Sequence, residues 1–162
     1  MTSKLLTVDP PRCTGCRKCE IACTENHQGM RESPRSRIHV MAGDIGQGFF
    51  LPSTCQQCAD PPCMAACPKG AIYRDPAAER VVIQRDLCVG CKMCVSACPT
   101  GAMGFDPDLG LAYKCDLCGG DPRCVRVCEP KALGYVEPYN LNHARMTESA
   151  AKLFHVVRRQ VA

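Results

Sequence analysis

Cysteine is the residue type through which this 162-residue chain could do chemistry, because sixteen cysteines fall into four groups of four with none left over. Within each group the first two cysteines are three positions apart, and the last follows its predecessor by four. Such spacing lets a tight loop wrap three thiolates around one iron–sulfur cluster, while the fourth thiolate reaches the neighbouring cluster. The pattern predicts four 4Fe-4S clusters in two interlocking pairs, with these ligands: Cys13, Cys16, Cys19, Cys23, Cys55, Cys58, Cys63, Cys67, Cys88, Cys91, Cys94, Cys98, Cys115, Cys118, Cys124 and Cys128.

Disulfide bonds and structural zinc are the alternative uses of so many cysteines. A secreted disulfide scaffold needs a signal peptide, and the opening sequence MTSKLLTVDP has no apolar region of that kind. Zinc sites combine pairs of cysteines from separate loops, whereas two of these groups place three cysteines within seven residues. We therefore expect iron–sulfur clusters, and the complete cysteine set gives no reason to expect a zinc site or a three-iron cluster.

Large apolar side chains are scarce in the chain, which has no tryptophan, four phenylalanines and four tyrosines. A small domain that cannot bury enough apolar surface needs a metal or a disulfide as a staple. The clusters would then serve as both core and staple. We expect the apoprotein to be largely unfolded.

The formal net charge of +4 counts every cysteine as a neutral thiol. Four oxidised clusters of about −2 each would bring the loaded protein to about −4. The basic residues are scattered rather than gathered in a stripe, so we expect no nucleic-acid partner. Six of them lie beside cysteines, where a cation could offset cluster charge, but taken singly each is interpreted as solvated surface: Arg17, Lys18, Lys92, Lys114, Arg123 and Arg126.

The sequence contains no run of about 18 to 20 apolar residues, so no direct membrane span is expected. Free thiolates and oxygen-labile clusters favour a reducing compartment. A cytoplasmic location is the resulting prediction.

Short strands and helical turns are expected to carry the cysteines, in an α+β fold with few long elements. Residues 5–8 and 81–83 are predicted strands that lead into cysteine loops. Residues 63–67 and 94–98 are predicted helical turns, each ended by the proline that follows it. An internal duplication is indicated by similar pentapeptides after three of the motifs, at 68–72, 99–103 and 129–133.

The first and third motifs are compact, whereas the second and fourth carry longer inserts with an Asp-Pro turn signal. Sensible pairing joins a compact motif to an expanded one, either sequentially (first with second, third with fourth) or nested (first with fourth, second with third). Spacing favours nesting, because only about twenty residues, including one strand, separate the second motif from the third. Residues 24–48 are then predicted to bridge two lobes.

Two other features are predicted to have no chemical role. The glycine-rich segment 43–48 follows a predicted strand at 38–41 but lacks the context of a dinucleotide site, so we interpret it as a turn. The four histidines lack metal-ligand spacing and are interpreted as surface or packing residues: His27, His39, His143 and His155.

The C-terminal segment is predicted to be an amphipathic helix from about Asn142 to Gln160. Its apolar residues recur at intervals of three and four, and charged residues occupy the opposite face. Packing against its own domain and docking on a partner subunit are the two interpretations.

The ordered motifs resemble the four-cluster electron-transfer subunits of multi-subunit oxidoreductases, over residues 5 to about 136. The phrases from Cys55 to Cys63 (CQQCADPPC) and from Lys114 to Cys118 (KCDLC) carry this resemblance. Such subunits accompany molybdenum or tungsten pterin enzymes, formate-linked hydrogenases and carbon monoxide dehydrogenases. The small subunits of tungsten-dependent aldehyde oxidoreductases are the most similar. Two positions depart from the family pattern and question local backbone geometry rather than ligation: Thr24, in place of proline, and Glu129, before Pro130.

The resemblance implies two ferredoxin-like, βαβ-type lobes stapled by clusters. Residues 1–48 with 104–136 would form one lobe, residues 49–103 the other, and 137–162 a helical tail. It also implies nested pairing, in which each motif takes its fourth ligand from its partner motif. The implied sets are Cys13, Cys16 and Cys19 with Cys128; Cys55, Cys58 and Cys63 with Cys98; Cys88, Cys91 and Cys94 with Cys67; and Cys115, Cys118 and Cys124 with Cys23.

The implied function is electron relay by a subunit that has no catalytic chemistry of its own. Single electrons would pass between a large catalytic subunit, bearing tungsten or molybdenum pterin and oxidising aldehydes, and a flavin-containing NAD-linked subunit or carrier. Self-association into a chain of subunits is a further expectation. The alternatives are a subunit of a hydrogenase, formate or carbon monoxide dehydrogenase complex, a redox-sensing iron–sulfur protein, and a free polyferredoxin carrier.

Overall fold

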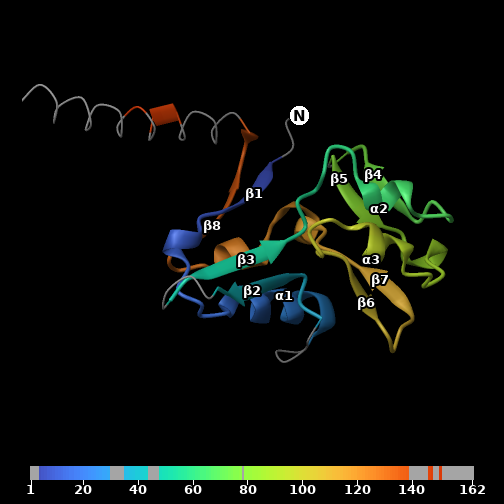
Figure 1. The fold of residues 1–162 in the computed structure, drawn as a ribbon, viewed down its shortest axis with the longest axis horizontal. Coiled ribbons are helices and arrows are strands. Elements are labelled where there is room, and N and C mark those ends of the chain that lie inside the picture. Colours follow the sequence, from blue (N-terminus) through green and yellow to red (C-terminus); the bar gives the residue numbers. More distant parts are fainter. Residues whose placement is uncertain are drawn as a thin grey trace, which may run out of the picture.

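A computed structural model of the chain describes residues 4–29, 35–43, 48–77 and 79–138, together with 146, 147 and 150. In this part of the chain the fold is α+β and built from short strands, which form four two-stranded antiparallel sheets (Figure 1). The pairs are β1 (Leu5–Val8) with β8 (Leu133–Val136), β2 (Ile38–Ala42) with β3 (Phe50–Thr54), β4 (Ile72–Asp75) with β5 (Arg80–Ile83), and β6 (Gly104–Asp106) with β7 (Leu111–Tyr113).

Each α-helix contains the third cysteine of one motif. The α-helices are α1 (Lys18–Gln28), α2 (Pro62–Ala65), α3 (Met93–Ala97) and α4 (Arg123–Arg126), and three 3-10 turns are η1 (Pro10–Arg12), η2 (Arg85–Leu87) and η3 (Leu117–Gly120). The sequence predictions of strands at 5–8, 38–41 and 81–83 and of helical turns near 63–67 and 94–98 are confirmed.

Helix α1 is longer than the others because Thr24 follows Cys23, at the position where proline follows Cys67 and Cys98. Threonine lets the helix continue, and its buried hydroxyl donates to the carbonyl oxygen of Ile21 at 2.9 Å. Gly29, at φ 69°, then ends the helix. The departure from the family pattern at Thr24 thus changes the backbone, as expected, by adding more than one helical turn after the last cysteine of the motif.

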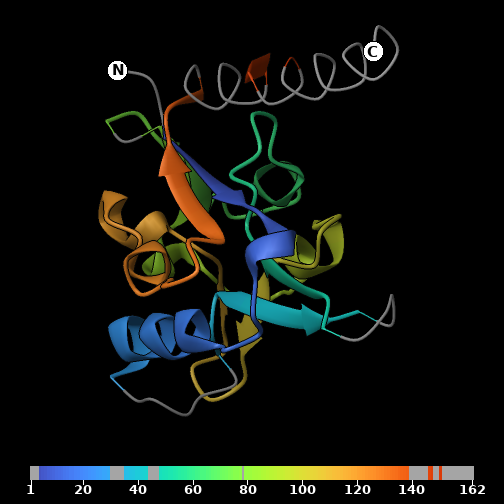
Figure 2. The same ribbon diagram turned by 90° about the vertical axis from the view of Figure 1, so that its left-hand side faces the viewer.

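The buried residues form two cores, and cysteines belong to both. One core contains Cys19, Cys23, Ile38, Val40, Cys124 and Leu133, from the first and fourth motifs and the strands near them. The other contains Cys63, Ile72, Val81, Cys94, Met103 and Ala112, from the second and third motifs and theirs. Figure 2 shows the blue β1 beside the orange β8, so the segment before the first motif meets the segment after the fourth.

The structure differs from the predicted division of the chain in two places. Within the segment predicted to bridge two lobes, Ile38 and Val40 of β2 are buried in the first core, and β3 pairs with β2 across the predicted boundary at 48/49. Ala112 of β7 lies in the second core, although residues 104–136 were assigned to the other lobe. The hairpin of β2 and β3 cannot be divided between lobes without breaking its ladder of hydrogen bonds, and the sequence pattern did not reveal this pairing.

Between the ends of β2 and β3, the Gly43 N–H donates to the carbonyl oxygen of Phe49 at 3.0 Å. Residues 44–47 and most of the predicted C-terminal amphipathic helix lie outside the described residues. Over the described ranges, no helix has both the length and the apolar character needed to cross a membrane.

Candidate iron–sulfur centres

All four cysteine motifs share one backbone feature, a left-handed residue immediately before the second cysteine. The φ angles are 72° at Gly15, 50° at Gln57, 68° at Gly90 and 57° at Leu117. This conformation costs a non-glycine residue about 1 to 2 kcal/mol. The compact motifs use glycine and the expanded ones do not. At Gln57 the side chain compensates, since its Oε1 accepts from the Val81 N–H and its Nε2 donates to the Cys115 carbonyl oxygen, both at 2.8 Å.

Gly90 gives a matched pair of variants with Gly101, because both glycines have φ near 65°. A methyl group on Gly90 would overlap the carbonyl oxygen of Gly110, whereas nothing lies within 4 Å of the same position on Gly101. We expect Gly90→Ala to lose iron from the third motif and Gly101→Ala to cost only the left-handed penalty of about 1 to 2 kcal/mol. Iron content and denaturant midpoints, measured anaerobically, check this. Equal behaviour of the two variants would show that the fit around Gly90 is unimportant.

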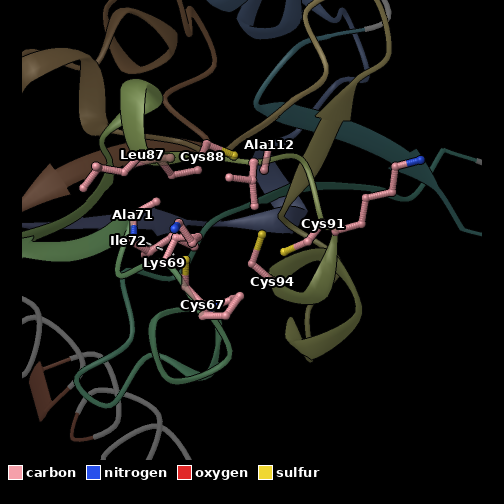
Figure 3. A pocket seen from close by; sticks show the side chains of 13 residues that line it. Cys67, Lys69, Ala71, Ile72, Leu87, Cys88, Cys91, Cys94 and Ala112 are labelled. Atoms are coloured by element: carbon pink, nitrogen blue, oxygen red, sulfur yellow. Dashed lines mark hydrogen bonds between the residues drawn. The ribbon is translucent and has the colours of Figure 1, made fainter.

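Three cavities are each lined by four cysteines, three from one motif and one from another. Figure 3 shows the first, where Cys88, Cys91 and Cys94 of the third motif meet Cys67 of the second, and the four sulfurs turn toward a common space. The other two cavities have the same composition: Cys55, Cys58 and Cys63 with Cys98, and Cys13, Cys16 and Cys19 with Cys128.

The remaining cysteines also lie close together. Burial raises the pKa of Cys124, and the nearby thiols of Cys115, Cys118 and Cys23 raise it further. Cys23 reaches this group from helix α1, which packs against α4. The structure therefore gathers three sets of four cysteines around cavities and places Cys124 close to the cysteines of the remaining group.

Burial raises the pKa of these thiols, and hydrogen bonds donated to the sulfur lower it. Burial raises the pKa of Cys19 to about 12, so that thiol keeps its proton unless a metal displaces it. Cys67 and Cys98 are different, because the opposing effect of burial is outweighed by backbone N–H groups of the residues that follow, and their pKa values are lowered. The Ala71 N–H, for example, donates to the Cys67 sulfur at 3.3 Å.

The duplicated pentapeptides supply these N–H groups. Each bends at a left-handed residue three positions after the last cysteine of its motif, and φ is 60° at Gly70, 65° at Gly101 and 52° at Lys131. Hydrogen bonds to sulfur stabilise a thiolate and tune a bound cluster. Sixteen thiols in four convergent sets, several with N–H donors, fit four cubane clusters.

His27 is a packing residue, as the sequence predicted, but it packs beside one of the cysteines. Its side chain is 10% exposed, and its Nε2 lies 3.7 Å from the Cys118 sulfur and 3.5 Å from Oδ1 of Asp116. Burial, followed by the charge of Arg37, lowers the pKa of His27, which favours the neutral ring. Residue spacing could not reveal this contact. The indication that the sequence did offer was Thr24, because a residue other than proline at this position lets α1 extend as far as His27.

The interpretation of the six neighbouring basic residues as solvated surface is confirmed for five and wrong for Lys114. Lys114 is 3% exposed, whereas Arg17, Lys18, Lys92, Arg123 and Arg126 are exposed. Lys114 is buried because it follows strand β7 directly and faces β5, where its Nζ reaches the Val81 carbonyl oxygen. A lone basic residue beside a cysteine carries no sequence signal of such a contact.

Comparison with known proteins places both halves of the described chain in one family. Residues 47–137 match the family model of the 4Fe-4S dicluster domain, and residues 12–71 match a second model with the same description. Two such domains with sixteen cysteines imply four 4Fe-4S clusters.

Curated relatives and one solved structure are also similar. The chain is 39% identical to the polyferredoxin-like subunit of aliphatic sulfonate oxidoreductase from Pyrococcus furiosus, over 55% of this chain and 50% of the relative. It is 37% identical to the electron transport protein HydN of Escherichia coli, over 57% of this chain and 54% of the relative. It thus spans about half the length of the curated relatives it matches. A chain of the active site complex BamBC of benzoyl coenzyme A reductase is 23% identical, covers 99% of this chain and 98% of that one, and has a TM-score of 0.47.

Proposed function

Because this chain belongs to the 4Fe-4S dicluster domain family, we propose that it relays single electrons as an iron–sulfur subunit of an oxidoreductase complex. The observation that carries the proposal is the convergence of three thiols from one motif with one from another. When bound, each 4Fe-4S cluster accepts and releases one electron. The residues of the chain hold the clusters, supply N–H donors to the sulfurs and exclude water.

The proposed ligand sets are nested. Each set combines the first three cysteines of one motif with the last cysteine of another; three cavities support three of the sets, and the mutual influence of the thiols around Cys124 supports the fourth. The sets are Cys13, Cys16, Cys19 and Cys128; Cys55, Cys58, Cys63 and Cys98; Cys88, Cys91, Cys94 and Cys67; and Cys115, Cys118, Cys124 and Cys23. Two lobes, one around each core, would then hold two clusters each, with the boundaries moved to keep β2 with β3 in the first lobe and to place the hairpin of β6 and β7 with the second core.

The proposed partner is a large catalytic subunit that carries tungsten or molybdenum pterin and oxidises aldehydes. The resemblance of the motif order supports this choice, and the similarity to a polyferredoxin-like subunit of an oxidoreductase agrees with the subunit role. A flavin-containing NAD-linked subunit, or a second copy of this chain, would meet the other end of the relay.

Anaerobic purification of the tagged chain from its native host tests the partner. We expect a large subunit to co-purify, with about one tungsten atom per complex and a pterin. Untagged cells purified in parallel are the control. Nickel in the large subunit would replace the aldehyde-oxidising partner with a hydrogenase or carbon monoxide dehydrogenase. Recovery of the iron-loaded chain alone would overturn the subunit role and favour a free carrier.

A further inference from the structure

Lys114 is a buried cation that lies between two of the cysteine sets. It is 3% exposed and directly precedes Cys115 of the fourth motif. It also lines the cavity formed by the second motif and Cys98. Its ammonium group donates to the carbonyl oxygen of Cys115 at 2.9 Å and to that of Val81 in β5. One side chain therefore touches the fourth motif and the core of the second and third motifs.

The charge of Lys114 has no carboxylate partner within the described residues, since both contacts of Nζ are to main-chain oxygens. Removing an ammonium ion from water costs several kcal/mol, and two carbonyl dipoles offset only part of that cost. A negative charge nearby must supply the remainder. The thiolates of the adjacent sets, or clusters bound to them, are the negative groups in reach.

The position of the ammonium group is held rigidly. Gln57 bridges the same two residues as Lys114, with its Oε1 on the Val81 N–H and its Nε2 on the Cys115 carbonyl oxygen, each at 2.8 Å. Gln57 belongs to the second motif and Cys115 to the fourth. Four hydrogen bonds thus fix the distance between these motifs and the ammonium group.

More positive charge lies on the other side of Lys114, around a cavity of about 360 Å³ lined also by Arg37, Arg80 and Arg85. Asp116 is the acidic residue of this lining and pairs with Arg37 at 2.8 Å. The Nε atoms of Arg37 and Arg80 are buried without a hydrogen-bond partner among the described residues. Arg80 also lies 3.7 Å from Asp75, so the four cations of this lining face two carboxylates, and the region keeps a net positive charge with Lys114 as its most buried cation.

We propose that Lys114 is an electrostatic positioning residue that raises the reduction potentials of the two clusters on either side of it, those of the second and fourth motifs. A fixed positive charge in a medium of low dielectric favours the reduced, more negative form of each cluster. Raising two neighbouring potentials together would make these clusters a matched pair through which electrons cross between the cores. This inference rests on the proposed electron relay.

Three variants of the full chain, loaded with clusters and kept anaerobic, test the proposal. Lys114→Gln removes the charge and keeps a donor, Lys114→Arg keeps the charge, and Lys4→Gln removes the same charge from an exposed lysine that lines none of the cysteine cavities. Potentiometric titration followed by electron paramagnetic resonance measures the midpoint of each cluster. For Lys114→Gln we expect the midpoint potentials of two of the four clusters to fall by about 59 mV. For a one-electron couple this is about a tenfold decrease in the equilibrium constant of reduction. The other two variants should match the wild type.

The outcomes separate this inference from the proposed function. If the wild type holds far fewer than about sixteen iron atoms, the relay itself fails. If it holds the full set and Lys114→Gln leaves every midpoint unchanged, only the role of Lys114 is overturned. If Lys114→Gln and Lys114→Arg both lose iron, the residue is a structural tie and the proposal is wrong. If only Lys114→Gln loses iron, the charge itself is needed to hold the clusters, and the electrostatic role of Lys114 is supported.

Discussion

Removal of iron is expected to unfold most of this chain. Anaerobic material should contain about sixteen iron atoms and about sixteen sulfides, since twelve cysteines line three four-cysteine cavities and the other four complete the fourth proposed set. Both cores include cysteines among their buried residues, and the chain has no tryptophan to replace the lost volume. Without clusters the few aliphatic side chains of each core would pack against small thiols around unfilled space, and a domain of this size has little other apolar surface to bury.

Anaerobic chelation followed by circular dichroism measures the effect. We expect the far-ultraviolet signal of the chelated protein to approach that of a denatured chain and its cooperative thermal transition to disappear. Reconstitution with iron and sulfide should restore both, which controls for irreversible damage. An apoprotein that keeps a cooperative transition near the holoprotein temperature would show that the strands and helices suffice. A reproducible zinc content near four with little iron would contradict the cluster assignment itself.

Replacing Cys98 by serine is expected to remove the cluster of the second motif and to spare that of the third, although Cys98 follows Cys94 by only four residues. Cys98 lines the cavity of Cys55, Cys58 and Cys63, while the third-motif cavity takes Cys67 instead. Burial opposes ionisation of Cys98, but the hydroxyl of Thr100 and backbone N–H groups from Thr100 onward direct partial positive charge at its sulfur and lower its pKa, so a thiolate is favoured there.

The expected loss is about four iron atoms, together with the spectroscopic signal of a single cluster. Cys67→Ser is the reciprocal variant and should remove the third-motif signal, whereas Ser96→Ala, an exposed change on α3, should keep all the iron. Loss of the same signal from Cys98→Ser and from Cys94→Ser would mean that each motif binds its own cluster, and nested ligation would be refuted.

Local chemistry in the sequence was sufficient to predict the cysteine groups, the strands near residues 5–8 and 81–83, and the helical turns. These features depend on interactions within a few residues, such as the spacing of thiols and the inability of Pro68 and Pro99 to continue a helix. The duplicated pentapeptides were likewise visible. The sequence did not reveal that these pentapeptides donate hydrogen bonds to cysteine sulfurs, because the φ angles at Gly70 and Gly101 and the N–H bonds to sulfur are features of the folded backbone.

The tertiary structure decided which residues from distant segments meet. From the sequence, Lys114 was interpreted as a surface lysine. It is buried because Val81, thirty-three positions away, offers a carbonyl oxygen on the edge of β5 that does not pair with β4. His27 reaches Cys118 across ninety-one positions because α1 continues past Thr24 and packs against α4. The hairpins β2–β3 and β6–β7 moved the lobe boundaries for the same reason. Burial and pairing depend on contacts between segments far apart in the chain, whereas spacing and turn chemistry are local, so only the latter could be read from the order of the residues.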